Sequence, residues 1–236
     1  MAVLWHRKQG NTTYEVRSAG RSIRLYENGI LHSQYHPERV FVGSVWDLLT
    51  LPALMMPAGS LKRVLMLGVG GGVVIRQLQR LMGPLEIIGV ELNPLHIKLA
   101  KKYFGLDESQ ATLVEAEAGE FVRNYDGPPF DLIVDDIFAE KNGQPERAIA
   151  ADETWCKLLL SRLSPQGALV TNFVSVKEFR SSALSSAKVS QWPYASAYSF
   201  STPHCDNIIS AYFRAPVPDG FLQLRLADHP LCRKKT

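Results

Sequence analysis

The sequence predicts an α/β fold with a seven-stranded sheet, made of five parallel strands and a C-terminal antiparallel hairpin, and a small N-terminal β element. Three observations lead to this prediction. Apolar strand-like runs alternate with amphipathic helical segments between Val64 and Phe173, which is typical of a parallel sheet covered by helices on both faces. Two β-prone runs after residue 190 are joined by a loop too short for a crossover helix, so they pair antiparallel. The first thirty-odd residues carry a separate β signal.

The N-terminal β signal consists of the short runs Thr13–Val16 and Ser22–Tyr26, followed by Asn28-Gly29 and Ile30. Asn-Gly between β-prone runs indicates a tight hairpin turn, because both turn residues must tolerate positive φ. We therefore predict a small β-hairpin element over residues 1 to about 35. A helix between Gly43 and Met56 then leads into the main domain.

The main domain alternates strands and helices in chain order. The predicted strands are Val64–Leu67, Glu86–Val90, Ala111–Val114, Phe130–Val134 and Ala168–Phe173. The predicted helices are Val73–Met82, Pro94–Phe104, Glu117–Asn124 and Asp152–Leu163, with a long loop over Ala139–Ile149. The closing hairpin pairs Tyr194–Phe200 with Ile208–Phe213.

Length and composition agree with this organisation. The 236 residues amount to about one and a half domains of ordinary size, so we expect an N-terminal element over 1–42 and a larger domain over 43–236. Apolar residues make up 46% and charged residues 21% of the chain, which excludes collagen-like, disordered and coiled-coil proteins.

Charge and cysteine content limit the partners and the compartment. The net charge is +3, and the tail Arg233, Lys234, Lys235 accounts for all of it, so no basic footprint for nucleic acid remains on the folded domain. Three cysteines without any CxxC spacing argue against a disulfide framework or a zinc site. The polar start MAVLWHRKQG and the lack of a long apolar run predict a cytoplasmic protein without a membrane segment.

Four glycines directly follow the first buried strand of the main domain, at Gly68, Gly70, Gly71 and Gly72. Glycines at such a turn let the backbone approach a ligand and aim the N–H groups of the next helix at it. The alternative is a tight strand-to-helix turn without a ligand. Val73 replaces the third glycine of the dinucleotide fingerprint, and no P-loop lysine follows, so a nicotinamide cofactor and a P-loop nucleotide are disfavoured.

Carboxylates follow the next two strands. Glu91 ends the second strand, about twenty residues after the glycines, where it can bond both hydroxyls of a ribose. A helix-start carboxylate favoured by the helix dipole is the alternative for Glu91, and the glycine loop tips the choice toward ribose. Glu117 follows the third strand and can bond an adenine amino group; Glu115 and Glu120 are rivals, and a solvated acidic face is an equal alternative.

Two adjacent acids, Asp135 and Asp136, end the fourth strand. Ligands of open α/β sheets bind beyond the carboxyl ends of the strands, and strand alternation turns only one of two neighbours toward the substrate. The other then makes a helix cap or a structural hydrogen bond. A magnesium site stays open as an alternative, although no third oxygen ligand is evident in the sequence.

The runs VLMLGVGGGVV, GVELNPLHIKLAKKYF, FDLIVDDIF and LSPQGALVTNF together resemble the class I S-adenosylmethionine-dependent methyltransferase fold. Within this fold the chain is similar to the spermidine synthase-like, polyamine aminopropyltransferase family. The segment ENGILHSQYHP resembles the N-terminal hairpin of that family. The resemblance implies a Rossmann-like sheet, no metal, and a nucleoside (decarboxylated S-adenosylmethionine or its product methylthioadenosine) over Gly68, Gly70 and Gly72. It also implies a small-molecule amine substrate, polyamine biosynthesis as the context, and a homodimer.

The resemblance further implies roles for individual residues. Glu91 falls at the ribose-binding acid, Glu117 at the adenine contact, Asp136 at the acid that accepts the amine proton, and Asp135 at the variable position before it, which we group with the nucleoside-binding residues. His32, Gln34 and Tyr35 follow the hairpin turn and form a lid over the substrate, or decorate a polar loop.

Two acids of the family are missing from this sequence. Gly71 stands where the family has an acid in the glycine loop, and Ala139 stands where it has an acid three residues after Asp136. Nucleoside binding depends less on these acids than the identity of the substrate does. The predicted activity is therefore transfer of an aminopropyl group, with two alternatives. One is a methyltransferase that uses S-adenosylmethionine itself. Because Gly71 has no side chain, it would leave room for the carboxylate of S-adenosylmethionine. The other is a catalytically silent nucleoside-binding protein of the same fold.

Overall fold

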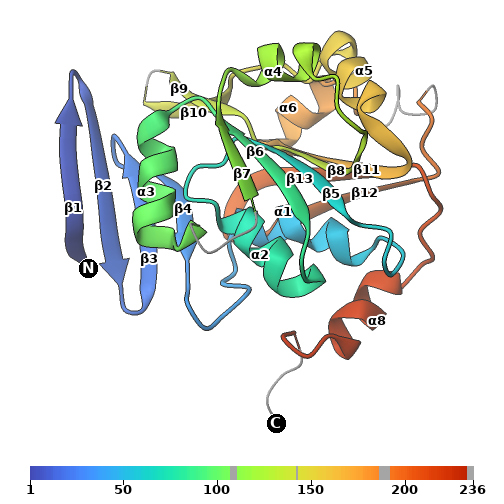
Figure 1. Ribbon diagram of the computed structural model, residues 1–236, viewed down its shortest axis with the longest axis horizontal. Helices are drawn as coiled ribbons and strands as arrows, with labels where there is room; N and C mark the ends of the chain where they lie inside the picture. The colour runs from blue at the N-terminus through green and yellow to red at the C-terminus, as the bar shows by residue number, and fades with distance from the viewer. Residues whose placement is uncertain (107–110, 142, 186–191, 233–236) are drawn as a thin grey trace.

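The computed structural model describes residues 1–106, 111–141, 143–185 and 192–232. A four-stranded N-terminal sheet stands beside a seven-stranded sheet that has helices on both faces (Figure 1). Helix α3 (Pro94–Phe104) lies between the two sheets, and helix α8 (Phe221–Asp228) lies near the C-terminus. The basic tail Arg233 to Lys235 lies outside the described residues.

The N-terminal element is larger than the predicted hairpin. Its strands β1 (Ala2–Gln9), β2 (Thr12–Ala19), β3 (Ser22–Glu27) and β4 (Ile30–Tyr35) pair antiparallel in chain order. The Asn28-Gly29 turn is confirmed, with φ of +48° and +80°, and it joins β3 to β4. Strand β1 was not predicted. Almost all of its residues are exposed, so it lacks the alternation of apolar and polar residues that indicates a half-buried strand.

The main sheet has the predicted architecture. Its strands are β5 (Arg63–Leu67), β6 (Glu86–Glu91), β7 (Ala111–Glu115), β8 (Phe130–Asp135), β11 (Leu163–Phe173), β12 (Ser196–Thr202) and β13 (Cys205–Phe213). They lie in the order β12-β13-β11-β8-β5-β6-β7, and β13 runs antiparallel to both of its neighbours. From β5 the chain adds β6 and β7 on one side and then returns to add β8 on the other side of β5. The direction in which strands are added therefore reverses between β5 and β8. A crevice opens at such a reversal.

Alternate residues of the strands pack against two different layers of helices. Val64 and Met66 face the layer of α1 (Val45–Leu54) and α2 (Val73–Met82), whereas Leu65 and Leu67 face the other side. That other side is covered by α4 (Ala118–Asn124), α5 (Glu153–Ser161) and α6 (Val176–Ser181). Helix α3 instead turns Leu95, Leu99 and Phe104 toward β2 and β3, so it fastens the N-terminal sheet to the domain.

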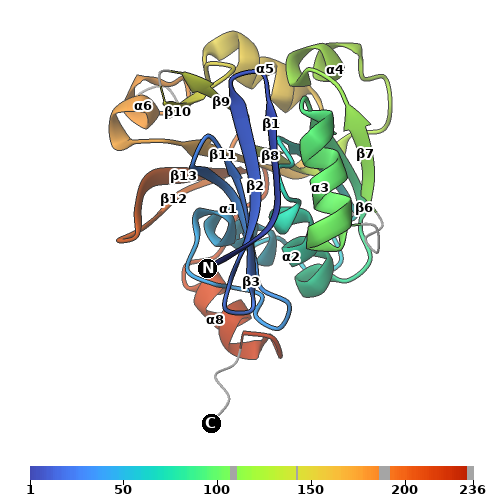
Figure 2. The ribbon, with the colours of Figure 1, turned by 90° about the vertical axis from the view of Figure 1, so that its left-hand side faces the viewer.

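Several short elements differ from prediction. The expected long loop folds as a two-stranded hairpin of β9 (Phe138–Lys141) and β10 (Gln144–Arg147). Helices α6 and α8 were not predicted; both are short and neither contains a buried residue, although Leu222 and Leu226 of α8 pack against an apolar cluster. Figure 2, in which the N-terminal sheet faces the viewer, shows α3 on one side of this sheet and β9 and β10 near its upper end.

The described residues form no helix with the length and apolar character needed to cross a membrane. Cys156, Cys205 and Cys232 all carry free thiols.

Candidate functional site

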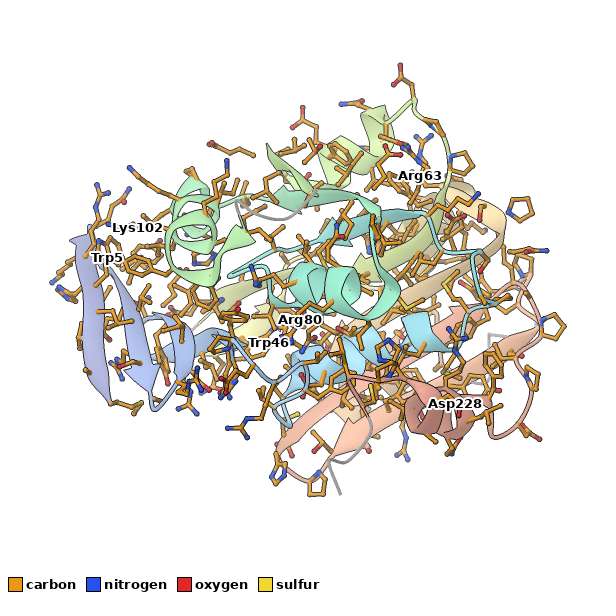
Figure 3. The ribbon with its side chains drawn as sticks, turned by 60° about the horizontal axis from the view of Figure 1, so that its bottom comes forward. Trp5, Trp46, Arg63, Arg80, Lys102 and Asp228 are labelled. Atoms are coloured by element: carbon orange, nitrogen blue, oxygen red, sulfur yellow. The ribbon has the colours of Figure 1, made fainter. Side chains whose placement is uncertain are left out.

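One large cavity, with a volume of about 1670 Å³, lies at the carboxyl ends of the parallel strands. The ends of β5, β6, β8 and β11 form its floor, and the N-terminal sheet forms one wall through β3, β4 and their turn. The β9–β10 hairpin and the turn between β12 and β13 complete its rim. Trp46, at the start of α1, lines the cavity and contacts the apolar clusters of both the main domain and the N-terminal sheet (Figure 3).

The glycine loop between β5 and α2 is held by close backbone contacts. Gly68 has φ of +82°, and a Cβ at this position would lie 2.1 Å from the carbonyl oxygen of Asp136. Gly70 has φ of +54°, and a Cβ there would lie 2.9 Å from Ser33 Oγ. Both positions therefore require glycine, which allows β5 to approach β8 and β4 closely. Gly68, Val69 and Gly70 line the cavity.

Gly72 is placed differently from our expectation of a ligand contact. It does not line the cavity, and it caps α2 in the left-handed conformation with φ of +76°. A Cβ at Gly72 would meet the side chain of Leu106 at 2.6 Å. Gly72 thus serves the turn and its packing rather than the cavity.

Gly71 is sealed off from the cavity by β4 and α3. Its N–H donates to Ser33 Oγ at 2.6 Å. A Cβ at Gly71 would lie 2.7 Å from Ser33 Cβ and 2.9 Å from Phe104 Cε1, so the space for any side chain is already filled. The loop therefore cannot carry an acid in this conformation.

Glu91, at the end of β6, lines the cavity and is bonded to the glycine loop. Its Oε2 accepts the N–H groups of Val69 at 3.0 Å and Gly70 at 2.8 Å, and its Oε1 accepts the N–H of Asn93 at 2.9 Å. Burial alone would raise the pKa of Glu91, but the attraction of His96 and these N–H groups outweighs it and lowers the pKa. Glu91 is thus an ionised acceptor beside the loop. Its Oε2 already accepts two N–H groups, so a bond to both hydroxyls of a ribose stays a prediction.

Glu117 also lines the cavity, and it caps the N-terminus of α4. Its two carboxylate oxygens accept the N–H groups of Gly119 at 2.8 Å and Glu120 at 2.6 Å. Each oxygen keeps an unused lone pair for a ligand donor. Glu115 and Glu120, the rival acids, do not line the cavity.

Asp136 points into the cavity next to the glycine loop. Its Oδ1 accepts Asn172 Nδ2 at 2.7 Å, and Asn172 Oδ1 in turn accepts Asn207 Nδ2 at 2.9 Å. Burial raises the pKa of Asp136 to about 6, despite the hydrogen bond from Asn172 and the charge of Arg147. The result is an oriented carboxylate that is ionised at neutral pH and more basic than an ordinary one.

Asp135 lies on the opposite side of β8 and does not line the cavity, so the expectation of a nucleoside contact does not match its placement. It is fully buried, forms an ion pair with Arg147 at 2.6 Å and accepts Trp155 Nε1 at 3.0 Å. Strand alternation sends Asp135 to the side of α5, where it has the structural role considered for one member of the pair.

The three residues expected at the hairpin divide between two places. His32 and Gln34 line the cavity, and Gln34 Oε1 accepts Arg24 Nε at 3.0 Å. Tyr35 does not line it, since its hydroxyl bonds Arg76 at 3.0 Å and its ring lies under the same guanidinium. Tyr35 therefore belongs to the packing between β4 and α2.

Sequence reasoning missed a buried cluster of charged side chains at the cavity wall. His96 of α3 lies between Glu27, at the end of β3, and Glu91, with nitrogen-to-oxygen distances of 3.0 Å and 3.7 Å. A histidine next to the apolar positions Leu95 and Leu99 was the available signal. Among the described residues, no group of three or more His, Cys, Asp or Glu side chains is arranged to hold a metal ion.

Comparison with known sequences identifies one family. The sequence model of the spermine/spermidine synthase domain matches residues 47–210. The polyamine aminopropyltransferase 2 of Caldanaerobacter subterraneus is 32% identical over 138 residues, which are 57% of this chain and 44% of that protein. The polyamine aminopropyltransferase of Aeropyrum pernix is 22% identical over 178 residues, 71% of this chain and 55% of its own. The matches thus span about half the length of these relatives.

Two solved structures share the fold over nearly the whole chain, and a third shares it over about three quarters. A probable spermidine synthase from Corynebacterium glutamicum superposes with a TM-score of 0.76 at 15% identity, covering 98% of this chain and 88% of its own. A spermidine synthase in complex with the transition state analogue AdoDATO has a TM-score of 0.70 at 16% identity, covering 97% and 78%. Human methyltransferase-like protein 13 in complex with SAH has a TM-score of 0.65 at 17% identity, and the match covers 76% of this chain and 87% of that protein. At these identities the likeness shows the fold alone.

Proposed function

The chain belongs to the spermine/spermidine synthase family, and from that premise we propose that it transfers an aminopropyl group from decarboxylated S-adenosylmethionine to a small amine in polyamine biosynthesis. The observation that carries the proposal is the position of Asp136. Its carboxylate shares one cavity with Gly68, Gly70 and Glu91, so an acid of raised pKa stands beside the loop proposed to hold the nucleoside.

The nucleoside end of the cavity is supported by the glycine loop and two carboxylates. We assign the ribose to Glu91, whose Oε1 accepts one N–H and retains a lone pair for a hydroxyl. We assign the adenine amino group to Glu117, at the end of the neighbouring strand. The names of the relatives and the SAH and AdoDATO complexes of the structural neighbours agree with a nucleoside of this type.

The charge of the cavity favours a cationic acceptor. Six carboxylates line it, against one arginine and three histidines, and no lysine is among the described lining residues. The acids are Glu27, Glu91, Glu117, Asp136, Glu140 and Asp206. Arg24, the one arginine, is bonded to Gln34. An amine that leaves water for this cavity thus meets charge partners, which lowers the cost of its desolvation.

The chemistry assigned to Asp136 follows from its surroundings. An aliphatic amine has a pKa near 10 and is protonated at neutral pH, so it must lose a proton before it can attack. Asp136 binds the ammonium and accepts that proton, for which its pKa of about 6 is better suited than that of an ordinary carboxylate. The nitrogen lone pair then attacks the carbon beside the sulfonium. The carbon–sulfur bond breaks, and its electron pair leaves with neutral methylthioadenosine.

The test compares Asp136→Asn with Glu120→Gln, an exposed acid on α4 that does not line the cavity. Product is measured by mass spectrometry with decarboxylated S-adenosylmethionine and a panel of diamines, and methylthioadenosine affinity by calorimetry. We expect Asp136→Asn to lower turnover by about 10²–10⁴-fold with little change in nucleoside affinity, and Glu120→Gln to change neither.

Three results would refute the proposal. Full turnover by Asp136→Asn would remove the base. Methyl transfer from intact S-adenosylmethionine would make the protein a methyltransferase. Tight nucleoside binding without product from any amine would leave a catalytically silent binding protein.

A further inference from the structure

A buried histidine joins the N-terminal sheet to the acid proposed to bind ribose. His96 Nε2 lies 3.0 Å from Glu27 Oε2, and its Nδ1 lies 3.7 Å from Glu91 Oε1. The side chains of His96, Glu91 and Glu27 are only 7%, 10% and 19% exposed. Glu27 and Glu91 end strands of two different sheets, so the imidazole bridges the two parts of the molecule.

Side chains from four strands face this histidine. The ring of His32, on β4, lies 5.4 Å from the ring of His96, and the ring of Tyr14, on β2, meets it edge-on at 5.9 Å. Asn93, which precedes α3, donates to the hydroxyl of Tyr14 at 3.2 Å. Glu27 and Glu91 supply the negative charge from β3 and β6, and Glu140 of β9 acts on His32 from farther away.

The charges decide which form each histidine adopts. Burial would lower the pKa of His96, but its contacts with Glu27 and Glu91 prevail and raise the pKa to about 9. Burial and the charge of His96 lower the pKa of His32. At neutral pH the cluster thus contains two carboxylates, one imidazolium and one neutral imidazole.

Without the imidazolium, two carboxylates would share a largely buried space with no counter-charge. One of them would then become protonated or turn toward the solvent of the cavity. Glu91 is the acid whose orientation matters, because its Oε2 holds the N–H groups of Val69 and Gly70. Loss of the cation therefore acts on the glycine loop through Glu91.

We infer that His96 is a positioning residue, which holds the Glu91 carboxylate against the glycine loop and fastens the N-terminal sheet to this edge of the cavity. The link to nucleoside affinity rests on the proposed function. The link to the orientation of Glu91 does not, because it concerns only groups of the chain itself.

The ligand-free test uses NMR on the full chain. We compare the wild type with His96→Gln, with Glu27→Gln and with His6→Gln, an exposed histidine of β1 that serves as the control. The His96 imidazole of the wild type should titrate near pH 9, and Glu27→Gln should move this titration down. In His96→Gln the amide protons of Val69 and Gly70 should exchange about tenfold faster, since a hydrogen bond to a charged acceptor is weakened.

The ligand test measures methylthioadenosine affinity between pH 6 and pH 10. The contribution of His96 is present at low pH and is lost as the pH rises through about 9, so wild-type affinity should fall in that range. His96→Gln should bind about tenfold more weakly at pH 7, without that fall. Its KM for the donor should rise while kcat changes little, and His96→Lys should recover part of the affinity.

A His96 titration at or below that of a free imidazole would overturn the inference, as would unchanged exchange at Val69 and Gly70 in His96→Gln. If His96→Gln loses stability but changes neither the amide exchange of Val69 and Gly70 nor the pH profile of methylthioadenosine affinity, then His96 is only a packing residue. If the wild type does not bind methylthioadenosine at all, the proposed function fails, and the NMR results still decide the role of His96. If His96→Gln does not fold, the titration in Glu27→Gln decides it.

Discussion

The carbonyl oxygen of Asp136 lies 2.1 Å from the point where a Cβ at Gly68 would stand. The turn that begins the glycine loop and the backbone of the proposed base are thus in direct contact, directly after β5 and β8, the two strands between which the order of the sheet reverses. A side chain at position 68 must move one of them.

Gly68→Ala should therefore cost more stability than backbone strain alone. Gly83 is the matched control, because it has the same φ of +82° and nothing within 4 Å of its hypothetical Cβ. Gly83→Ala should cost about 1–3 kcal/mol, because φ of +82° with ψ of −161° is a conformation that glycine almost alone adopts. Gly68→Ala should cost clearly more and also lower turnover, because Asp136 is displaced. Urea denaturation measures both variants. Equal losses of stability would show that the contact with Asp136 is easily relieved.

Gly71→Ala should be destabilising by about 1–3 kcal/mol, because Ser33 and Phe104 fill the space of the new methyl group. Shortening the neighbour in Ser33→Gly should relieve part of this cost. A double-mutant cycle measured by denaturation should show a favourable coupling of about 1 kcal/mol between the two changes. Strictly additive effects would mean that Phe104 alone opposes a side chain at position 71.

Breaking the buried Asp135–Arg147 pair should destabilise the fold strongly. Arg147→Met leaves the Asp135 carboxylate buried with Trp155 as its remaining hydrogen-bond partner among the described residues, at a cost of about 3–5 kcal/mol. The double variant Asp135→Asn/Arg147→Met should lose less than the sum of the single changes. Lys157→Met, which breaks an exposed pair with Glu153 on α5, should cost less than about 1 kcal/mol. Similar losses at both sites would contradict the buried pairing.

The pH dependence of activity and of stability should both report Asp136. Below pH 6 the base becomes protonated, so kcat/KM should fall as the pH drops through about 6. The folded-state pKa is above the ordinary value of 3.8, so ionisation of Asp136 opposes folding, and this cost appears as the pH rises from about 4 to about 6.

Asp136→Asn should accordingly be more stable than the wild type at pH 8 and equally stable below pH 4. Denaturation at both pH values tests this, with Glu120→Gln as a control for the loss of an exposed carboxylate. If Asp136→Asn is less stable than the wild type at pH 8, then ionisation of Asp136 does not lower the stability of the folded protein.

The main domain was predictable because its strands and helices follow simple periodicities. Residues Val64 to Leu67 alternate between two helix layers, and each is fully or almost fully buried, so this run was evident as a central strand. β9 and β10 gave no such signal, because they pair only with each other and the described residues of β10 are mostly exposed. The sequence did contain one local signal, because Asn142-Gly143 between the two strands is the same hairpin dipeptide as Asn28-Gly29, and the prediction overlooked it.

The site was predictable where function depends on the end of a strand, and unpredictable where it depends on packing between sheets. Glu91 and Asp136 line the cavity because they end or follow β6 and β8, the two parallel strands on either side of β5. Asp135 and Asp136 are chemically equivalent, and only the position of α5 decides which is turned away. Glu27 and His96 are 69 positions apart and meet only because α3 packs on the N-terminal sheet, which no local pattern contains.

The N-terminal sheet supplies one wall of the cavity from a separate stretch of the chain. Glu27, His32 and Gln34 lie before residue 47, outside the segment matched by the family, yet they line the same cavity as Asp136. A chimera that takes residues 1–42 from a relative would keep Asp136 and the sequence of the glycine loop, and it would replace the wall together with Ser33, which accepts the N–H of Gly71. Grafting this segment is therefore a route to altered ligand preference, and a successful graft must bring an acid that pairs with His96.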